Sequence, residues 1–592
     1  MHKRTFLRAA LSGLSLISLT IRTQMNTAAL AVLPDAAVWA LGLWALWQLY
    51  GAFEKQKTPA RLWVLSAVFA GVMTLGQSFA ALGTAEWVTG HKLEALLFFA
   101  GRVPLYCAGM QLLLRALARP GKQVHLSAVR FGGLLLLCWL PWYVCLFPGT
   151  VSTDSVSQLK IILGLMPMSN ANPICQTGLV AAFRWLGETL GGGPDLAVAL
   201  YCITQAVLMA WLLGTLLHLM GRSAAPRWLV WGSFAFYAFC PVFPVFAFCV
   251  GKDTNFAMAV LFLSIEVWRA LHEENPKPIR WVCMGVAAVC CVVLRNAGVY
   301  LALITLAVVC LCRRRGTIPA CGLACAVGVY ALLHLVIIPG MHIAPMPETE
   351  EYSIPLQQVA RVAAGDALTP EQAEAVDGVL VLSELRSAYN GELSDPVKNL
   401  WRTDATEDEK AAFWRAWLDI VKDNPATCLS ATFHNTYAYL YPGYVSTIKP
   451  TLIIGNHSTR TASVKGYFDY TVNPLSTPLK AFTDTLLVNP LYRVLVSPGL
   501  YGWLTLLCTA VLLGTKDGIL KGKALERDSK GQRPLAAGGF VCAIPALFTL
   551  VGCLFSAVNG YFRYAMPLYL CTPFLLWLIS NHEGGKSHEP KV

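Results

Sequence analysis

One segment at the end of an apolar run carries the leading candidate for chemistry in this sequence. Residues 147–155 read FPGTVSTDS, and the apolar run before them covers 131–146. Pro-Gly is typical of a turn, and the carboxylate of Asp154 comes directly after it. A carboxylate just outside a membrane span can act on a substrate at the lipid surface. We therefore predict a catalytic or ligand-binding role for Asp154. The competing and compatible interpretation is a helix cap formed by Thr153-Asp154-Ser155.

Like Asp154, several other polar residues lie within or at the ends of the apolar runs. A charge in or beside the hydrocarbon costs roughly 2.5–3.5 kcal/mol on insertion scales, so several on one face are expected to have a function. An arginine can donate two parallel hydrogen bonds to a phosphate. The competing interpretations are a snorkelling pair for Lys252-Asp253, an unpaired interfacial Arg295 and a structural salt bridge for Arg563. The binding candidates from this pattern are Asn170, Asn172, Lys252, Asp253, Arg295, Asn296, Arg563 and Tyr564.

The composition places the chain among membrane proteins. It is 56% hydrophobic and only 14% charged, whereas soluble chains carry about a quarter charged residues. The net charge of +12 comes from Lys and Arg scattered between apolar runs, which is typical of the positive-inside rule and excludes nucleic acid as the expected partner. Membrane lipid is the expected partner instead. Most of the 19 cysteines lie in apolar runs, so neither a zinc site nor a disulfide framework is predicted.

The elements that must position these residues are transmembrane helices. The fold class expected is an all-α polytopic membrane protein with about 13–14 spans of roughly 20 residues each. The run 281–312 is too long for one span and is expected to break at Arg295-Asn296. Residues 1–22 can be a signal peptide or a first span. The other apolar runs lie near 30–52, 62–83, 93–117, 127–147, 195–220, 228–249, 254–271, 318–338, 493–513, 535–555 and 565–581.

Three regions follow from this arrangement of spans. Residues 1–338 form an N-terminal transmembrane region, and the positive-inside rule places its loop 148–172 outside the cell membrane. Residues 339–490 hold most of the acidic residues and amphipathic stretches at 371–385 and 407–421, so we expect a mostly helical extracytoplasmic domain. Residues 491–592 add the last helices and a cytoplasmic tail. We expect the sequon at Asn456 to be incidental.

Eight short motifs together resemble the GT-C class of membrane glycosyltransferases, and more closely a bacterial family of uncharacterised polytopic membrane proteins related to it. One difference is that the family has His before the proline of the second motif, where this chain has Ala171-Asn172. The motifs are FPGTVSTDS (147–155), SNANP (169–173), GKDT (251–254), LRNAG (294–298), SIPLQQVAR (353–361), SDPVK (394–398), YLYPGY (439–444) and FRYAMP (562–567).

The resemblance implies transfer of a sugar from a polyprenyl-phosphate donor to an envelope glycan or protein on the outer face. Asp154 would be the general base, and the leaving phosphate would be surrounded by Lys252, Arg295 and Arg563. A further set of residues would line the donor or acceptor site: Gln357, Gln358 and Arg361. No cofactor is assigned. A divalent metal through Asp154 and Asp253 is left open, and no metal ligand set is predicted.

Three other functions compete with this one. A ligase or polymerase of cell-surface polysaccharide also takes lipid-linked sugars but normally has a different arrangement of loops. In a transporter or flippase of lipid-linked or envelope precursors, the same charges would line a pathway. Against it, the halves of the chain show no inverted repeat, and a large outer domain is unusual in such folds. In a structural membrane protein, the charges would have no common role.

Overall fold

The computed structural model describes most of the chain. The described residues are 2–21, 35–53, 58–273, 277–312, 317–444, 462–471, 473–514 and 538–580. The sequon at Asn456 and the tail 582–592 lie outside them. Within these ranges the protein is almost entirely helical, with a single two-stranded sheet.

Seven described helices are long and apolar enough to cross a membrane, so a multi-pass membrane protein is supported by length and composition. They are α3 (Ala60–Leu82), α5 (Lys92–Leu117), α6 (Ala128–Leu146), α9 (Gly193–Arg222), α12 (Lys252–His272), the continuous segment α15 (Thr317–Ala331), η1 (Leu332–Ile337) and α16 (Ile338–Gly340), and α29 (Phe562–Ser580).

The expected 13–14 spans exceed this number because several apolar runs form shorter or bent helices. An eighth span is obtained if α26 (Pro490–Val496) and α27 (Pro498–Leu513) count as one, although they are bent by 59°. Three apolar helices have only 15 or 16 residues: α13 (Ile279–Leu294), α14 (Gly298–Cys312) and α28 (Gly539–Leu554). The helices α1 (His2–Thr20) and α2 (Asp35–Phe53) precede α3, and the short α4 (Glu86–Gly90) lies between α3 and α5.

The two irregular apolar runs behave differently. The run 281–312 breaks at Arg295, whose backbone is extended between α13 and α14, so this prediction is confirmed. The run 228–249 was expected to be one span, and this is wrong: it forms α10 (Arg227–Phe239), α11 (Val242–Ala247) and strand β2 (Cys249–Val250). Pro241 has no N–H to continue α10, and the residue before a proline is driven out of the helical region.

A separate helical lobe is formed by residues 353–436. Its core is buried around Leu356, Phe413 and Ile420 and is distinct from the main core. Capping boxes begin two of its helices, at Thr369 and Thr406. The helices are α17 (Ser353–Ala364), α18 (Pro370–Asp377), α19 (Leu382–Ala388), α20 (Asp395–Lys398), α21 (Glu407–Asp423) and α22 (Pro425–Thr436). The stretch 407–421 is thus helical as predicted, whereas 371–385 is divided between α18 and α19.

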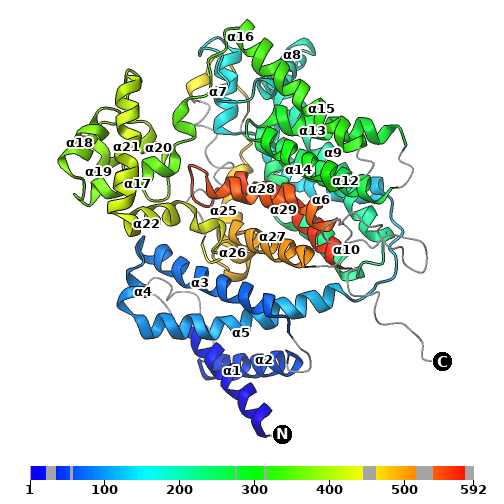
Figure 1. Cartoon of the computed structure of the whole chain (residues 1–592). Coiled ribbons are helices and arrows are strands. Elements are labelled where there is room, and N and C mark those ends of the chain that lie inside the picture. Colours follow the sequence, from blue (N-terminus) through cyan, green and yellow to red (C-terminus); the bar gives the residue numbers. More distant parts are fainter. Residues whose placement is uncertain are drawn as a thin grey trace.

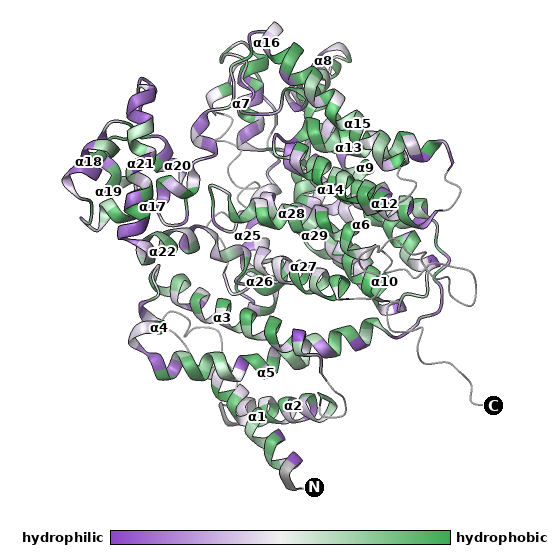
Figure 2. Ribbon diagram, viewed as in Figure 1, coloured by the Kyte–Doolittle hydropathy of each residue, from purple (hydrophilic) through white to green (hydrophobic). Residues whose placement is uncertain are grey.

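Figure 1 shows the lobe to one side of the apolar helices, with α22 leading back toward α3. Figure 2 shows the lobe and α7 as the more hydrophilic parts and α9, α12–α15 and α27–α29 as largely hydrophobic. The remaining elements are β1 (Thr150–Val151), α7 (Thr153–Ile162), α8 (Ile174–Thr189), η2 (Glu348–Glu350), η3 (Tyr437–Tyr439), η4 (Ala462–Val464) and α25 (Ser476–Leu486).

Candidate functional site

Two loops about 100 residues apart in sequence are joined by the short sheet. Strands β1 and β2 are parallel, with Thr150 opposite Cys249 and Val151 opposite Val250. Each strand leads directly into a helix, β1 into α7 and β2 into α12. The sheet therefore places the N-termini of α7 and α12 side by side. Their first-turn N–H groups carry partial positive charge, which favours acidic side chains and anions there.

Gly149 allows β1 to lie close against α9. Its φ of +143° is a conformation that side-chain-bearing residues rarely adopt. A Cβ at this position would lie 2.4 Å from Sγ of the buried Cys202 on α9. The Pro-Gly turn predicted from the sequence therefore has a steric reason for its glycine.

Ser152, not Asp154, caps helix α7. Ser152 is the N-cap residue, and its hydroxyl accepts a hydrogen bond from the backbone N–H of Ser155. The Ser155 hydroxyl donates to the carbonyl of Val250 in the neighbouring strand, at 2.8 Å. The interpretation of Asp154 as the cap is therefore wrong. Its side chain belongs to the first turn of α7 and makes other contacts.

Asp154 lies between two cations. Its Oδ2 is 2.9 Å from Nζ of Lys252, and its Oδ1 is 3.0 Å from Nη1 of Arg563. Lys252 begins α12 and Arg563 lies in the first turn of α29. All three side chains are largely shielded, with 21%, 15% and 13% of Asp154, Lys252 and Arg563 exposed. The ion pairs thus tie together three segments that are distant in sequence.

A second carboxylate extends this network. Asp253 is 8% exposed, and its Oδ2 is 3.6 Å from Nε of Arg563 while its Oδ1 is 3.6 Å from Nη1 of Arg295. Neither Asp253 Oδ1 nor Arg563 Nε has a hydrogen-bond partner in the described part of the chain. Together the five groups carry three positive and two negative charges. The cluster therefore has an excess positive charge and polar atoms with unused hydrogen-bonding capacity.

Aromatic rings line the two arginines. The guanidinium of Arg295 lies 5.4 Å from the ring centre of Phe256 and 5.0 Å from that of Tyr564. The guanidinium of Arg563 lies 4.6 Å from the ring of Tyr561 and 5.1 Å from that of Tyr564. Cation–π contacts of this kind hold a guanidinium in place without consuming its N–H groups. Tyr561 and Phe256 were not predicted from the sequence, because aromatic residues are enriched near membrane interfaces whether or not a site lies there.

The asparagines connect the SNANP segment to the cluster. Nζ of Lys252 donates to Oδ1 of Asn172 at 2.6 Å. Nδ2 of Asn296 donates to the backbone carbonyl of Asn170 at 2.9 Å. Asn172 is therefore in direct contact with the charged groups, whereas Asn170 and Asn296 support the loop beside them.

The charges around Asp154 determine its protonation. Burial by itself would raise the pKa of the carboxyl, but Arg563 and Lys252 outweigh it and hold the pKa of Asp154 well below its usual range. The carboxylate is thus ionised and, while both cations remain on it, a weak proton acceptor.

The start of α29 is held by the segment that follows the lobe. The hydroxyl of Tyr439 donates to the carbonyl of Val558 at 2.8 Å and accepts from the N–H of Tyr561 at 3.0 Å. Ser394 N–H from the lobe donates to the carbonyl of Ala557 at 2.8 Å. These bonds fix the loop that carries Arg563 into the cluster, so the YLYPGY and SDPVK motifs act on the cluster through the backbone.

Three predicted site residues lie elsewhere. Gln357, Gln358 and Arg361 belong to α17 in the lobe. Nε2 of Gln357 donates to the carbonyl of Asn390, and Nε2 of Gln358 donates to Thr432 Oγ1. Arg361 donates to the hydroxyl of Tyr389 and to the carbonyl of Gly83. Since these contacts are internal or join the lobe to α3, the three residues are not part of the Asp154 cluster.

The arrangement does not fit a divalent metal. Among the described residues, no group of three or more His, Cys, Asp and Glu side chains could hold a metal ion. The guanidinium of Arg563 pairs with both Asp154 and Asp253. A metal between the two carboxylates would have to displace it.

A comparison with protein families identifies the family of this chain. The model of a family of unknown function (DUF6020) matches residues 164–520, which is more than half of the chain. The chain belongs to this family. The DUF6020 match includes Lys252, Asp253 and Arg295, while Asp154 and Arg563 lie on either side of it. Neither the curated proteins nor the solved structures contain a match.

Proposed function

We propose that this protein is a membrane glycosyltransferase that moves a sugar from a polyprenyl-phosphate donor to a cell-envelope acceptor on the outer face. The observation that supports this proposal is the position of Asp154 between Lys252 and Arg563, at 2.9 and 3.0 Å, where α7, α12 and α29 begin. This contact supports the proposal because the carboxylate that would act as base and two cations that would bind the phosphate are neighbours.

The cations suit the leaving group. In the proposed step, a hydroxyl oxygen of the acceptor attacks the anomeric carbon, the bond from that carbon to the phosphate oxygen breaks, and the phosphate leaves with the bonding electrons. Lys252, Arg563 and Arg295 are the groups that would stabilise its negative charge. Arginine is well suited because its planar fork can donate two hydrogen bonds to one phosphate.

The proton of the acceptor hydroxyl goes to Asp154. With both cations on it, this carboxylate has a pKa well below its usual range and is a weak base. A bound phosphate competes for the same N–H groups. As Lys252 and Arg563 turn toward the phosphate, the pKa of Asp154 rises and the carboxylate becomes a better proton acceptor. Donor binding thus prepares the base.

The test is transfer of label from a radiolabelled polyprenyl-phosphate sugar pool in membranes that contain the wild type or Asp154→Asn at equal amounts. Loss of a general base is expected to lower transfer about 100-fold or more. Asp366→Asn is the matched control, because Asp366 lies in the lobe and its side chain is 76% exposed; transfer should be unchanged. Equal transfer by Asp154→Asn would refute the role of Asp154. Absence of transfer in the wild type would favour the transporter.

A further inference from the structure

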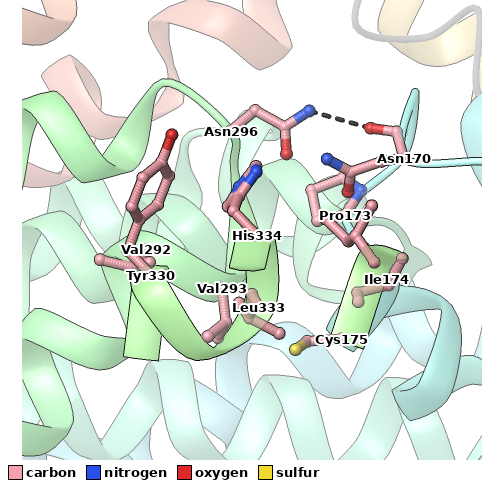
Figure 3. A pocket seen from close by; sticks show the side chains of 11 residues that line it. Asn170, Pro173, Ile174, Cys175, Val292, Val293, Asn296, Tyr330, Leu333 and His334 are labelled. Atoms are coloured by element: carbon pink, nitrogen blue, oxygen red, sulfur yellow. Dashed lines mark hydrogen bonds between the residues drawn. The ribbon is translucent and has the colours of Figure 1, made fainter. Parts of the chain in front are cut away.

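A pocket lies beside the charged cluster, between the start of α8, the end of α13 and the π-helical segment η1. Figure 3 shows Asn170, Asn296 and the ring nitrogens of His334 toward one end, and Leu333 and Cys175 toward the other. The pocket is therefore amphipathic along its length. π-helical turns such as η1 occur frequently at functional sites.

The helix that forms one wall of the pocket is the least buried of the candidate membrane spans. The segment 317–340, which contains η1, is the most apolar of the candidate spans, with a mean hydropathy of 2.3, and only 11% of its most apolar window is buried inside the protein. Leu335 on this segment is 75% exposed. A ligand with a hydrocarbon part can therefore reach the pocket from the membrane.

His334 is the unusual residue of this span. An ionisable side chain within a membrane helix is costly and marks a functional site by default. The ring of His334 packs against that of Tyr330, with 4.2 Å between the ring centres and an angle of 32° between the ring planes. It has neither a hydrogen bond nor an ion pair with any other residue that the structure describes. The imidazole faces the pocket with its hydrogen-bonding capacity unused.

The polar end of the pocket is linked to the charged cluster through neighbouring residues of the chain, although no charged residue of the cluster lines the pocket. Asn170 and Asn296 line the pocket and are joined by a hydrogen bond of 2.9 Å. Asn296 directly follows Arg295, and Asn172, two residues after Asn170, accepts from Lys252. A phosphate at the cluster can therefore have its apolar substituent in the pocket.

We propose that the pocket at His334 binds the first part of the hydrocarbon chain of a phosphate-bearing membrane lipid, with the imidazole beside the phosphate and the rest of the chain in the surrounding membrane. This inference rests on the proposed function for the identity of the lipid, a polyprenyl phosphate. The binding itself requires no sugar transfer.

Cys175 is a built-in reporter, because it lines the pocket and is only partly buried. The experiment measures maleimide labelling of Cys175 by peptide mass spectrometry in the detergent-solubilised full chain. A polyprenyl phosphate should protect Cys175, whereas inorganic phosphate or the phosphate-free polyprenol should not. Equal protection by inorganic phosphate would show that the pocket binds a free anion and would refute the lipid as its ligand. Equal protection by polyprenol would show that the phosphate does not contribute to binding and would refute its place beside His334. Absence of labelling without lipid, or labelling unchanged by lipid, would overturn it.

Two tryptophan variants on one helix provide a matched pair. Leu333 lines the pocket, whereas Leu335 lies two residues away and faces outward. Leu333→Trp should fill the pocket and raise the concentration of polyprenyl phosphate needed for protection about tenfold, while Leu335→Trp should leave it unchanged. Equal effects would refute the pocket. Since labelling does not depend on catalysis, Asp154→Asn can abolish transfer while protection persists, so failure of the glycosyltransferase proposal is distinguishable from failure of this one.

Discussion

The ion pair between Arg563 and Asp154 should be much stronger than a pair of the same geometry in the lobe. Arg563 Nη1 lies 3.0 Å from Asp154 Oδ1, and Arg386 Nη1 lies 3.0 Å from Asp366 Oδ2. The side chains of the first pair are 13% and 21% exposed, and those of the second are 71% and 76% exposed. The two pairs therefore have the same separation and differ in their contact with water.

The expected magnitudes follow from this difference. A shielded hydrogen bond between charged groups contributes about 1.5–3 kcal/mol, whereas an exposed ion pair contributes about 0–1 kcal/mol. Lys252 also compensates Asp154, so the coupling of Arg563 with Asp154 should fall near the middle of its range, about 2 kcal/mol. The coupling of Arg386 with Asp366 should be about 0.5 kcal/mol.

The assay is a pair of double-mutant cycles on the free energy of unfolding in detergent micelles, followed by tryptophan fluorescence. The first cycle combines Arg563→Gln with Asp154→Asn, and the second combines Arg386→Gln with Asp366→Asn. Arg563→Lys is a useful third variant, because it keeps the charge but cannot bridge Asp154 and Asp253 with a planar fork. Coupling energies that agree within about 0.5 kcal/mol would refute the conclusion that shielding strengthens the Arg563 pair.

Three further outcomes are expected. Gly149→Ala should lower the free energy of unfolding by about 1–3 kcal/mol, because φ at this position is +143° and the added Cβ would meet Cys202. Unfolding in detergent micelles measures the change, and an unchanged free energy would contradict the prediction. The pKa of Asp154 is lowered in the folded state, so the stabilisation by its carboxylate is complete above the unfolded pKa of about 3.9 and is lost as the pH falls through the folded pKa. The difference in unfolding free energy between the wild type and Asp154→Asn should therefore be constant from about pH 6 to 8. A change of this difference with pH in that range would argue against the ion-paired state. Gln358→Ala should destabilise the lobe, because Gln358 accepts a hydrogen bond from Trp417 Nε1 at 2.8 Å. Label transfer should be unchanged. A loss of transfer at equal stability would show that Gln358 takes part in the reaction site.

The sequence by itself determined the features that depend on neighbouring residues. The long apolar runs predict membrane helices because about 20 apolar residues are needed to cross the hydrocarbon. The helix at 407–421 follows from its amphipathic period. The break at Arg295 follows from a charged residue within a run too long for one span. Each of these signals acts over a few turns of helix.

The tertiary structure decided the contacts between segments that are far apart in the chain. The pairing of β1 with β2 places Asp154 beside Lys252, and the bonds of Tyr439 to the loop before α29 bring Arg563 to the same point. The same structure assigns Gln357, Gln358 and Arg361 to the lobe. Sequence pattern could identify these side chains as polar groups near helix ends. Only the register of the strands and the packing of the helices determine which charges meet, because those depend on contacts hundreds of residues apart.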